Sequence, residues 1–559
     1  MASPGTSPTP QDILDKYRRE FALRTAAGTI RPLVVPYHFY GFGLLVLYLS
    51  FSHTQRPWLY ALRWPVLATV IAFQAKTLLQ TSSTDMGSGF GAGIVAVYIM
   101  MSAATWLVWY RPQFESRRIV RREPAQKATQ DGLESVTKGA ESDKHAISDS
   151  TIRKRKISSR PEKEGMKDPG EEKEIEYYWQ SYPDNFKARL DWVVDLLSNQ
   201  RGERWNWAIP TLPPRPPSVR RSLGESVQGT DDEVRVSSAG HYTFSSRKEV
   251  FRACIPKVTL GYVLLDFLKT AMMHDPYFII GPNSYPLPSH LASLHPVLVR
   301  MSRQLLTFVA ITVALECGFL LQAILALLSE EGSRKHGIRS EAWMYPTQWG
   351  SFSIILTKGL NGLWGGWWHQ TFRFLFAAPT NYLISKKIIE PRSITAKLVG
   401  LFVAFAISGM LHAGGSLTQF PDTYPMQPFV FFMLQAVGII VQTTLCTSFK
   451  TPISSLPPSI KKLGNLIFTF GWLSLTADWL IDDFARGGLW LFEPLPFSFL
   501  RGMGLYPDRN GGWWCWQHMG MSWYSSPHHW WESGIALGGT SLAEMLGGFR
   551  GWVWKNGLW

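Results

Sequence analysis

The sequence predicts an all-α membrane protein, a polytopic bundle of about eight spanning helices. Three runs without Asp, Glu, Lys or Arg support this fold class: Leu33–Phe51, Phe90–Tyr110 and Pro425–Phe449, of 19, 21 and 25 residues. About 20 apolar residues cross the hydrocarbon core of a bilayer. The 25 Trp, 32 Phe and 19 Tyr residues also fit a protein whose aromatic side chains lie at the headgroup level.

Five less uniform runs bring the expected number of spans to eight: Tyr60–Leu79, Val258–Met273, Leu305–Leu328, Leu398–Phe420 and Leu463–Trp479. Phe372–Ile388 is either a ninth span or a segment that enters the bilayer without crossing it. Such backbone is tolerated at depth where protein or water surrounds it.

The segments outside the spans differ in composition. Residues 1–32 hold Pro and charged residues but no apolar signal core, so we expect a cytosolic or interfacial segment before the N-terminal spans at 33–110. Residues 111–180 are too highly charged to fold alone and are predicted to be disordered. Residues 181–252 should order against the membrane core at 253–500, and residues 501–559 are a Trp/Gly-rich interfacial tail.

The formal net charge of +14 does not indicate nucleic acid, because many basic residues crowd around span ends, as in cytoplasmic loops. Basic residues precede the first span, and five arginines between Arg111 and Arg122 follow the third. Three crossings place these clusters on opposite sides, so the orientation of the N-terminus stays open. Asp266 and Lys269, three residues apart on a helical run, are expected to pair.

Several common enzyme signatures are absent, including G-x-S-x-G, the Walker phosphate loop, H-E-x-x-H and paired C-x-x-C. The four scattered cysteines lack metal-ligand spacing. We therefore expect no metal and no tightly bound cofactor.

Two histidines lie in unusually apolar surroundings: His369 in Trp364-Gly365-Gly366-Trp367-Trp368-His369-Gln370, and His412 in Ile407-Ser408-Gly409-Met410-Leu411-His412. Ionisable groups at membrane depth are costly and tend to be functional. A neutral imidazole can take a proton from an alcohol. Taken alone, the residues leave a structural alternative open, a hydrogen-bonded histidine between helices or an interfacial aromatic belt.

These two segments resemble the F-W-G-R-R-W-H/N and S-G-x-x-H motifs of the wax synthase branch of the membrane-bound O-acyltransferases. Further matches are Arg201-Gly202 through Trp205-Asn206-Trp207, Leu265-Asp266 through Asp275-Pro276-Tyr277, Trp343 and Pro346. The likeness covers roughly residues 186–500. It is greatest to fungal members that acetylate terpenoids or other secondary-metabolite alcohols.

The resemblance implies a helical bundle with a tunnel, in which His412 is the catalytic base and His369 a second polar residue of the site. The alcohol then attacks the thioester of acyl-CoA, most simply acetyl-CoA, and His369 polarises the carbonyl or orients the alcohol. We expect substrate contacts from Trp364, Trp368, Gln370 and Ser408. This sequence differs from the family motifs in two places, so the family's residue roles do not all apply here. Gly366 and Trp367 replace two arginines of the first motif, and Ala413 stands where an acidic residue often follows the histidine of the second.

Coenzyme A carries phosphates, so we expect Lys358 and Arg373, with Lys386 and Lys387 nearby, to contact it. Orientation in the membrane is the plainer explanation of these charges. The other expected partners are a hydrophobic alcohol and the lipid bilayer, in a multi-pass protein of the endoplasmic reticulum. The alternatives are a long-chain wax-ester synthase, a secondary transporter, against which the lack of an internal repeat argues, and a membrane scaffold without activity.

Overall fold

The computed structural model describes residues 7–122, 176–226, 234–332, 338–508, 512–516 and 520–539. Most of the predicted disordered loop (123–175) and the end of the predicted tail (540–559) lie outside the described residues. The described part is mostly helical, with seven short strands in three small sheets. The helical fold class is therefore confirmed, while the number of spans stays a prediction.

Four helices of the described part are long and apolar enough to cross a membrane. They contain most of the predicted runs Phe90–Tyr110, Leu305–Leu328, Leu398–Phe420 and Pro425–Phe449. They are α5 (Met86–Ala104) with its π-helical continuation η2 (Thr105–Trp109), α13 (Pro296–Gly332), α16 (Ile394–Leu417) and α17 (Met426–Ser448).

Four more predicted runs are largely helical: α4 (Arg63–Gln80), α10 (Arg247–Met273), α15 (Arg373–Ser385) and α19 (Pro458–Thr476). The shorter helices are α1 (Pro10–Ala26), α3 (Pro57–Ala61), α6 (Pro112–Glu115), α8 (Phe186–Ser198), α9 (Pro217–Ser222), α11 (Pro276–Ile280), α12 (Ser289–Ala292), α14 (Ser353–Gly362), α18 (Lys450–Ser455), α20 (Asp478–Arg486) and α21 (Phe499–Gly502). Single 3-10 or π turns are η4 (Ile338–Ser340), η5 (Ala342–Met344), η6 (Leu363–Trp367), η7 (Leu489–Leu491) and η9 (Trp530–Glu532).

The prediction of a helix over Leu33–Phe51 is wrong in its first part. Strands β1 (Arg31–Pro32) and β2 (Val34–Val35) and the turn η1 (Tyr37–Phe39) come first, and α2 covers only Tyr40–Ser50. Eleven residues rise roughly 16 Å, about half of a bilayer core. Pro36 explains the late start, because proline lacks an N–H and disfavours helix at the residue before it.

Short strands join distant parts of the chain. β1 pairs in parallel with β3 (Thr81–Ser82), and β2 pairs with β7 (Gly534–Gly539), which also pairs with β6 (Gly520–Tyr524). Part of the predicted tail thus forms a sheet with residues at the first predicted span. β4 (Arg118–Arg122) and β5 (Glu176–Gln180) pair antiparallel, which brings Arg122 opposite Glu176.

Glycines let α5, α16 and α17 pack closely. A Cβ added to Gly93 of α5 would lie 1.9 Å from the carbonyl oxygen of Gly414 in α16, and one on Gly409 would lie 2.9 Å from the Phe429 ring of α17. Small residues of this kind allow membrane helices to approach backbone to backbone. Helix α16, which carries His412, is therefore held from two sides.

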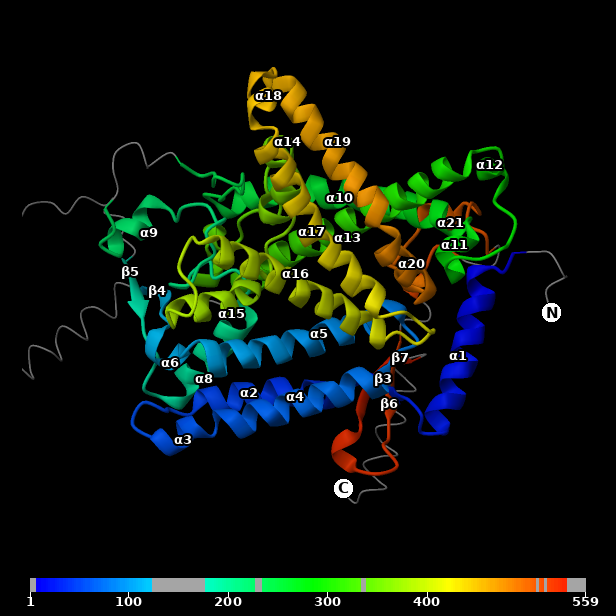
Figure 1. The fold of residues 1–559 in the computed structure, drawn as a ribbon. Coiled ribbons are helices and arrows are strands. Elements are labelled where there is room, and N and C mark those ends of the chain that lie inside the picture. The colour runs from blue at the N-terminus through cyan, green and yellow to red at the C-terminus, as the bar shows by residue number, and fades with distance from the viewer. Residues whose placement is uncertain are drawn as a thin grey trace, which may run out of the picture.

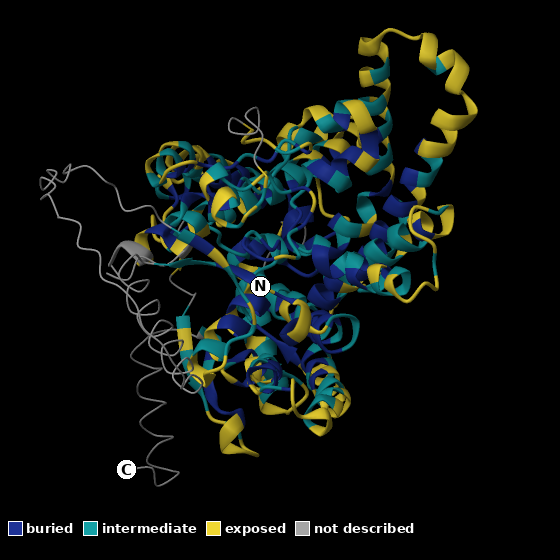
Figure 2. Cartoon of the chain, turned by 90° about the vertical axis from the view of Figure 1, so that its left-hand side faces the viewer, coloured by how far each residue is buried: buried dark blue, intermediate teal, exposed yellow. Residues whose placement is uncertain are grey.

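Figure 1 shows α2, α4 and α5 side by side along one edge of the molecule, with α18 projecting from the opposite edge between α17 and α19. The same projection is largely exposed in Figure 2.

The expected pair of Asp266 and Lys269 is wrong. Asp266 accepts hydrogen bonds from Ser498 Oγ (2.5 Å) and the Phe499 N–H (2.8 Å). Lys269 donates to the carbonyls of Trp490 and Phe492 at 2.5 and 3.0 Å. The partners of both groups lie at residues 490–499, in the segment before α21 and at its start. The spacing of Asp266 and Lys269 on α10 does not reveal these partners.

Candidate active site

The first predicted motif lies at a helix break. Gly359 in α14 has φ +59°, and a Cβ there would lie 1.9 Å from Gln442 Nε2 of α17. Positive φ favours glycine. Gln442 Oε1 accepts the hydrogen bond of the Leu360 N–H at 2.9 Å. The chain then forms η6, leaves helical geometry at Trp368 and becomes helical again at Arg373.

Two polar side chains support the backbone at this break, where helical hydrogen bonds are missing. Gln370 Nε2 donates to the carbonyls of Trp364 (3.0 Å) and Trp368 (2.6 Å). Arg373 donates to the carbonyl of Gly365 (2.8 Å) and to Gln370 Oε1 (2.5 Å). Gln370 is buried, and its side chain is hydrogen-bonded within its own loop, so its predicted contact with substrate stays a prediction.

His369 follows this turn and is half-buried among aromatic rings. Its ring centroid lies 5.4 Å from that of Trp368 and 6.0 Å from that of Trp349, and its Nδ1 lies 3.1 Å from Thr371 Oγ1. Burial, with smaller contributions from His412 and Arg201, lowers the pKa of His369 to about 3. The imidazole is therefore neutral at pH 7 and is a hydrogen-bonding group there.

His412 lies within α16, and its own helix fixes its orientation. Nδ1 is 2.9 Å from the carbonyl oxygen of Ser408. A carbonyl only accepts, so Nδ1 carries the proton and the neutral ring has its lone pair on Nε2. Among the described residues, nothing forms a hydrogen bond with Nε2, and this atom is not completely buried. The geometry presents an unprotonated ring nitrogen, as a general base requires.

An aromatic wall connects the two histidines. The His412 ring lies 4.3 Å from Phe432, which lies 5.9 Å from Trp364. Trp364 lies 5.6 Å from Trp368, the direct neighbour of His369. The structure thus brings together both predicted catalytic residues and both predicted tryptophans.

Sequence reasoning missed the residues that hold this turn from outside. Arg201 is buried and donates to the carbonyls of Pro346 (3.0 Å) and Thr347 (3.1 Å), and His241 Nδ1 donates to the same Thr347 carbonyl at 2.9 Å. The Gly350 N–H in turn donates to the Trp367 carbonyl at 3.1 Å. Arg201 and Pro346 were noted only as family matches, and His241 gave no sequence signal.

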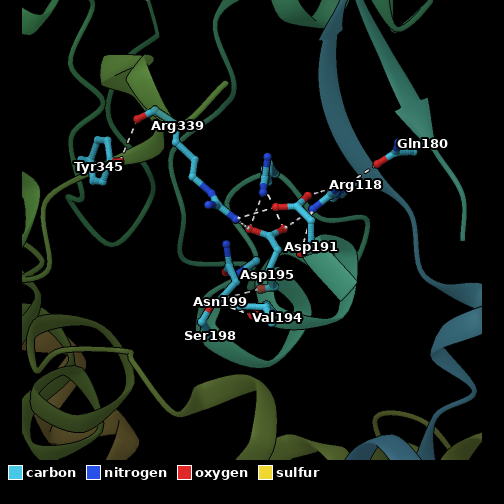
Figure 3. A network of polar contacts seen from close by, with 11 residues as sticks. Arg118, Gln180, Asp191, Val194, Asp195, Ser198, Asn199, Arg339 and Tyr345 are labelled. Carbon is cyan, nitrogen blue, oxygen red and sulfur yellow. Dashed lines mark hydrogen bonds and ion pairs between the residues drawn. The ribbon is translucent and has the colours of Figure 1, made fainter. Parts of the chain in front are cut away.

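A network of charges anchors the segment that contains Arg201 (Figure 3). Asp195 of α8 accepts from Arg204, and Arg118 of β4 lies 2.6 Å from Asp191 and 3.6 Å from Asp195. Arg339 reaches both aspartates at 3.5 Å. The network joins β4, α8 and η4 and holds the segment that contains Arg201 in place.

The predicted coenzyme A contacts lie in different settings. Arg373 is bonded into the motif turn, and within the described ranges no carboxylate lies at ion-pair distance from it. Lys358 is exposed on α14 and forms no hydrogen bond or ion pair with a described residue. No group of three His, Cys, Asp or Glu in the described part is arranged to hold a metal ion.

Comparison with known proteins confirms the family resemblance. Residues 345–434, which include both histidine motifs, match the model of the membrane bound O-acyl transferase family. The acetyltransferase eriL of Hericium erinaceus is 29% identical over 152 residues, 26% of this chain and 38% of the relative. The acetyltransferase ple2 of Rhodocybe pseudopiperita is 40% identical over 77 residues, 14% and 20% of the two chains.

A third relative bears a different name. The O-Mevalon transferase macI of Penicillium terrestre is 24% identical over 279 residues, 46% of this chain and 53% of the relative. The matched segments thus span from a fifth to about half of these relatives. No solved structure matches this chain.

Proposed function

We propose that this chain, which carries a membrane bound O-acyl transferase segment at residues 345–434, transfers an acetyl group from acetyl-CoA to a hydroxyl of a hydrophobic secondary metabolite such as a terpenoid. The observation that carries the proposal is the orientation of His412. Its Nδ1 is bonded to the Ser408 carbonyl, which leaves Nε2 as an available base beside an aromatic wall.

The chemistry needs one base and one hydrogen-bonding group. His412 Nε2 takes the proton of the acceptor hydroxyl while the hydroxyl oxygen attacks the thioester carbon. As the C–O bond forms, the C–S bond breaks, and the imidazolium returns the proton to the leaving sulfur. The products are the acetate ester and coenzyme A. His369, neutral at pH 7, hydrogen-bonds the thioester carbonyl or the alcohol.

The remaining site residues have supporting roles in this proposal. Trp364 and Trp368 form a wall for the apolar acceptor, and Ser408 holds His412 through its carbonyl. Both hydrogen bonds of Arg373 in the turn come from Nη1, and its Nε and Nη2 groups contact coenzyme A together with Lys358. The names of the acetyltransferase relatives support acetyl as the acyl group.

The proposed setting is a multi-pass protein of the endoplasmic reticulum, in which about eight spans enclose a tunnel between acyl-CoA and the lipid bilayer. The four long apolar helices and the family match support a membrane location. No resident cofactor is needed, because acyl-CoA is a co-substrate.

The test is incubation of membranes containing the full chain with labelled acetyl-CoA or palmitoyl-CoA and a panel of terpenoid and long-chain alcohols. We expect acetate esters of a terpenoid alcohol, formed by the unmodified chain and not by His412→Ala. Long-chain esters from palmitoyl-CoA would indicate a wax-ester synthase. No ester with any pair, at normal abundance of the protein, would contradict acyl transfer.

A further inference from the structure

One face of α10 changes its chemistry along the helix. Lys248 and Arg252 are exposed near its start. Further along, Ile255, Val263 and Phe267 are 52%, 57% and 57% exposed. These positions are separated by three, four or eight residues, so they share one helical face. An exposed apolar stripe on a membrane protein is the surface expected to face lipid.

The basic end of this face is a shallow, open depression. Arg247, Lys248 and Arg252, with Phe251, Ile255 and Pro256, line an open groove of about 590 Å³. α13 supports the groove from behind, since the Arg247 guanidinium donates to the Leu327 carbonyl and Phe251 packs in a cluster that includes Leu327.

The groove has an excess of positive charge among the described residues. The nearest described carboxylate on the helix, Glu249, is used by Tyr242 Oη at 2.5 Å and by Ser245 Oγ at 2.7 Å. Glu316, further along, pairs with Lys257 at 3.9 Å. No carboxylate whose side chain the structure describes pairs with Lys248 or Arg252. Two available cations beside an apolar stripe are complementary to a ligand with an anionic head and apolar tails.

We propose that this surface, the α10 basic groove, binds the headgroup of an anionic phospholipid. Lys248 and Arg252 contact the phosphate, and the acyl chains run along Ile255, Val263 and Phe267. A soluble phosphate compound uses the two charges and leaves the apolar stripe uncovered, which is why the geometry favours a lipid. The inference does not depend on the proposed acyl transfer.

The test uses the purified full chain in neutral detergent micelles, with fluorescent phosphatidylserine and phosphatidylcholine as probes. We expect phosphatidylserine to bind at least tenfold more tightly, since each basic residue near an anionic lipid surface contributes several-fold in affinity. The double variant Lys248→Gln/Arg252→Gln should lose most of this preference. A matched control, Lys450→Gln/Lys462→Gln, removes two exposed lysines at α18 and α19 and should keep it.

A photoactivatable phosphatidylserine should cross-link to the peptide containing residues 247–256. Equal binding of the two lipids, an unchanged preference in the groove variant, or adducts only elsewhere would overturn the proposal. Displacement of phosphatidylserine by free coenzyme A or inorganic phosphate at micromolar concentration would assign the groove to a soluble phosphate ligand instead. Circular dichroism of the double variant checks that it is folded.

Discussion

His412 and His369 lie against the same aromatic wall but are held in different ways. His412 lies within the continuous helix α16, and the residue one turn before it supplies its hydrogen-bond partner. His369 lies at a helix break whose backbone needs Gln370, Arg373 and, through the loop before it, Arg201. The hydrogen bond that orients the first histidine is local, whereas the turn that carries the second depends on contacts with segments more than a hundred residues away. Distant substitutions should therefore affect His369 and spare His412.

The largest effect is expected at His412. His412→Ala should lower turnover roughly a hundredfold or more, the scale of losing a general base, because its Nε2 is the unprotonated nitrogen that the bond from Nδ1 to the Ser408 carbonyl leaves available. Turnover with acetyl-CoA and an identified alcohol measures this, with abundance and acyl-CoA binding as controls for folding. Turnover at the unmodified rate would return His412 to a structural role.

Arg201→Ala should disturb the turn that carries His369, because Arg201 holds the loop that precedes this turn. Removing a buried guanidinium leaves Glu203 and the Pro346 carbonyl without their partner, while the Thr347 carbonyl keeps His241, at a cost of about 3 kcal/mol in the free energy of unfolding. Denaturation in detergent measures this. Arg24→Ala, which removes an exposed ion pair with Glu20, is the control and should cost less than about 1 kcal/mol.

Turnover of the Arg201→Ala variant tests whether Arg201 affects catalysis through His369. If Arg201 acts through His369, the combination of Arg201→Ala and His369→Ala should lower turnover less than the product of the two single effects. Independent, multiplicative effects would show that Arg201 stabilises the fold without positioning His369.

His369 itself should show the tolerance of a hydrogen-bonding group. His369→Ala should impair turnover, whereas His369→Asn should retain part of it, because an amide still donates and accepts hydrogen bonds. Initial rates of the two variants, normalised to protein abundance, measure the difference. Equal loss in both would mean that His369 moves a proton and that the two histidines share the base role.

A smaller effect concerns pH. The pKa of His369 is about 3 in the folded chain against an ordinary value near 6.5, so the unfolded state binds more protons between these values. Above pH 6.5 this difference in proton binding does not affect folding. As the pH falls from 6.5 toward 3, protonation of His369 in the unfolded state lowers the free energy of unfolding. The melting temperature of His369→Asn should therefore fall less than that of the unmodified chain between pH 7.5 and 5. Parallel curves would contradict a neutral, buried His369.

The smallest effect is expected from deleting residues 125–170, which belong to neither histidine site. β4 and β5 hold Arg122 opposite Glu176, so residues 123–124 and 171–175 remain to join them. A charged segment of this kind contributes little to a helical core. Turnover and membrane abundance should stay near normal. A loss of turnover at normal abundance would show that the loop binds a substrate or partner.

Much of the helical pattern was predictable from the sequence. The runs at Phe90–Tyr110 and Pro425–Phe449 are long enough for a spanning helix, and the structure has α5 with η2 and α17 there. The run at Leu33–Phe51 likewise lacks Asp, Glu, Lys and Arg but contains Pro36, and only its second half is helical. Apolar content predicts burial or lipid contact, while backbone restrictions decide where a helix begins.

The sequence by itself determined the helical class and the two histidines, because these depend on the apolar runs and their neighbours along the chain. The bond between His412 and the Ser408 carbonyl came from the structure, since the sequence predicted only a substrate contact for Ser408. Only the tertiary structure decided the contacts of His369, the role of Arg201 and His241 at Thr347, and the separate partners of Asp266 and Lys269. Those contacts depend on which loops meet when the helices pack. A buried polar group takes whichever partner packing brings within hydrogen-bond distance, and spacing along the chain does not encode that partner.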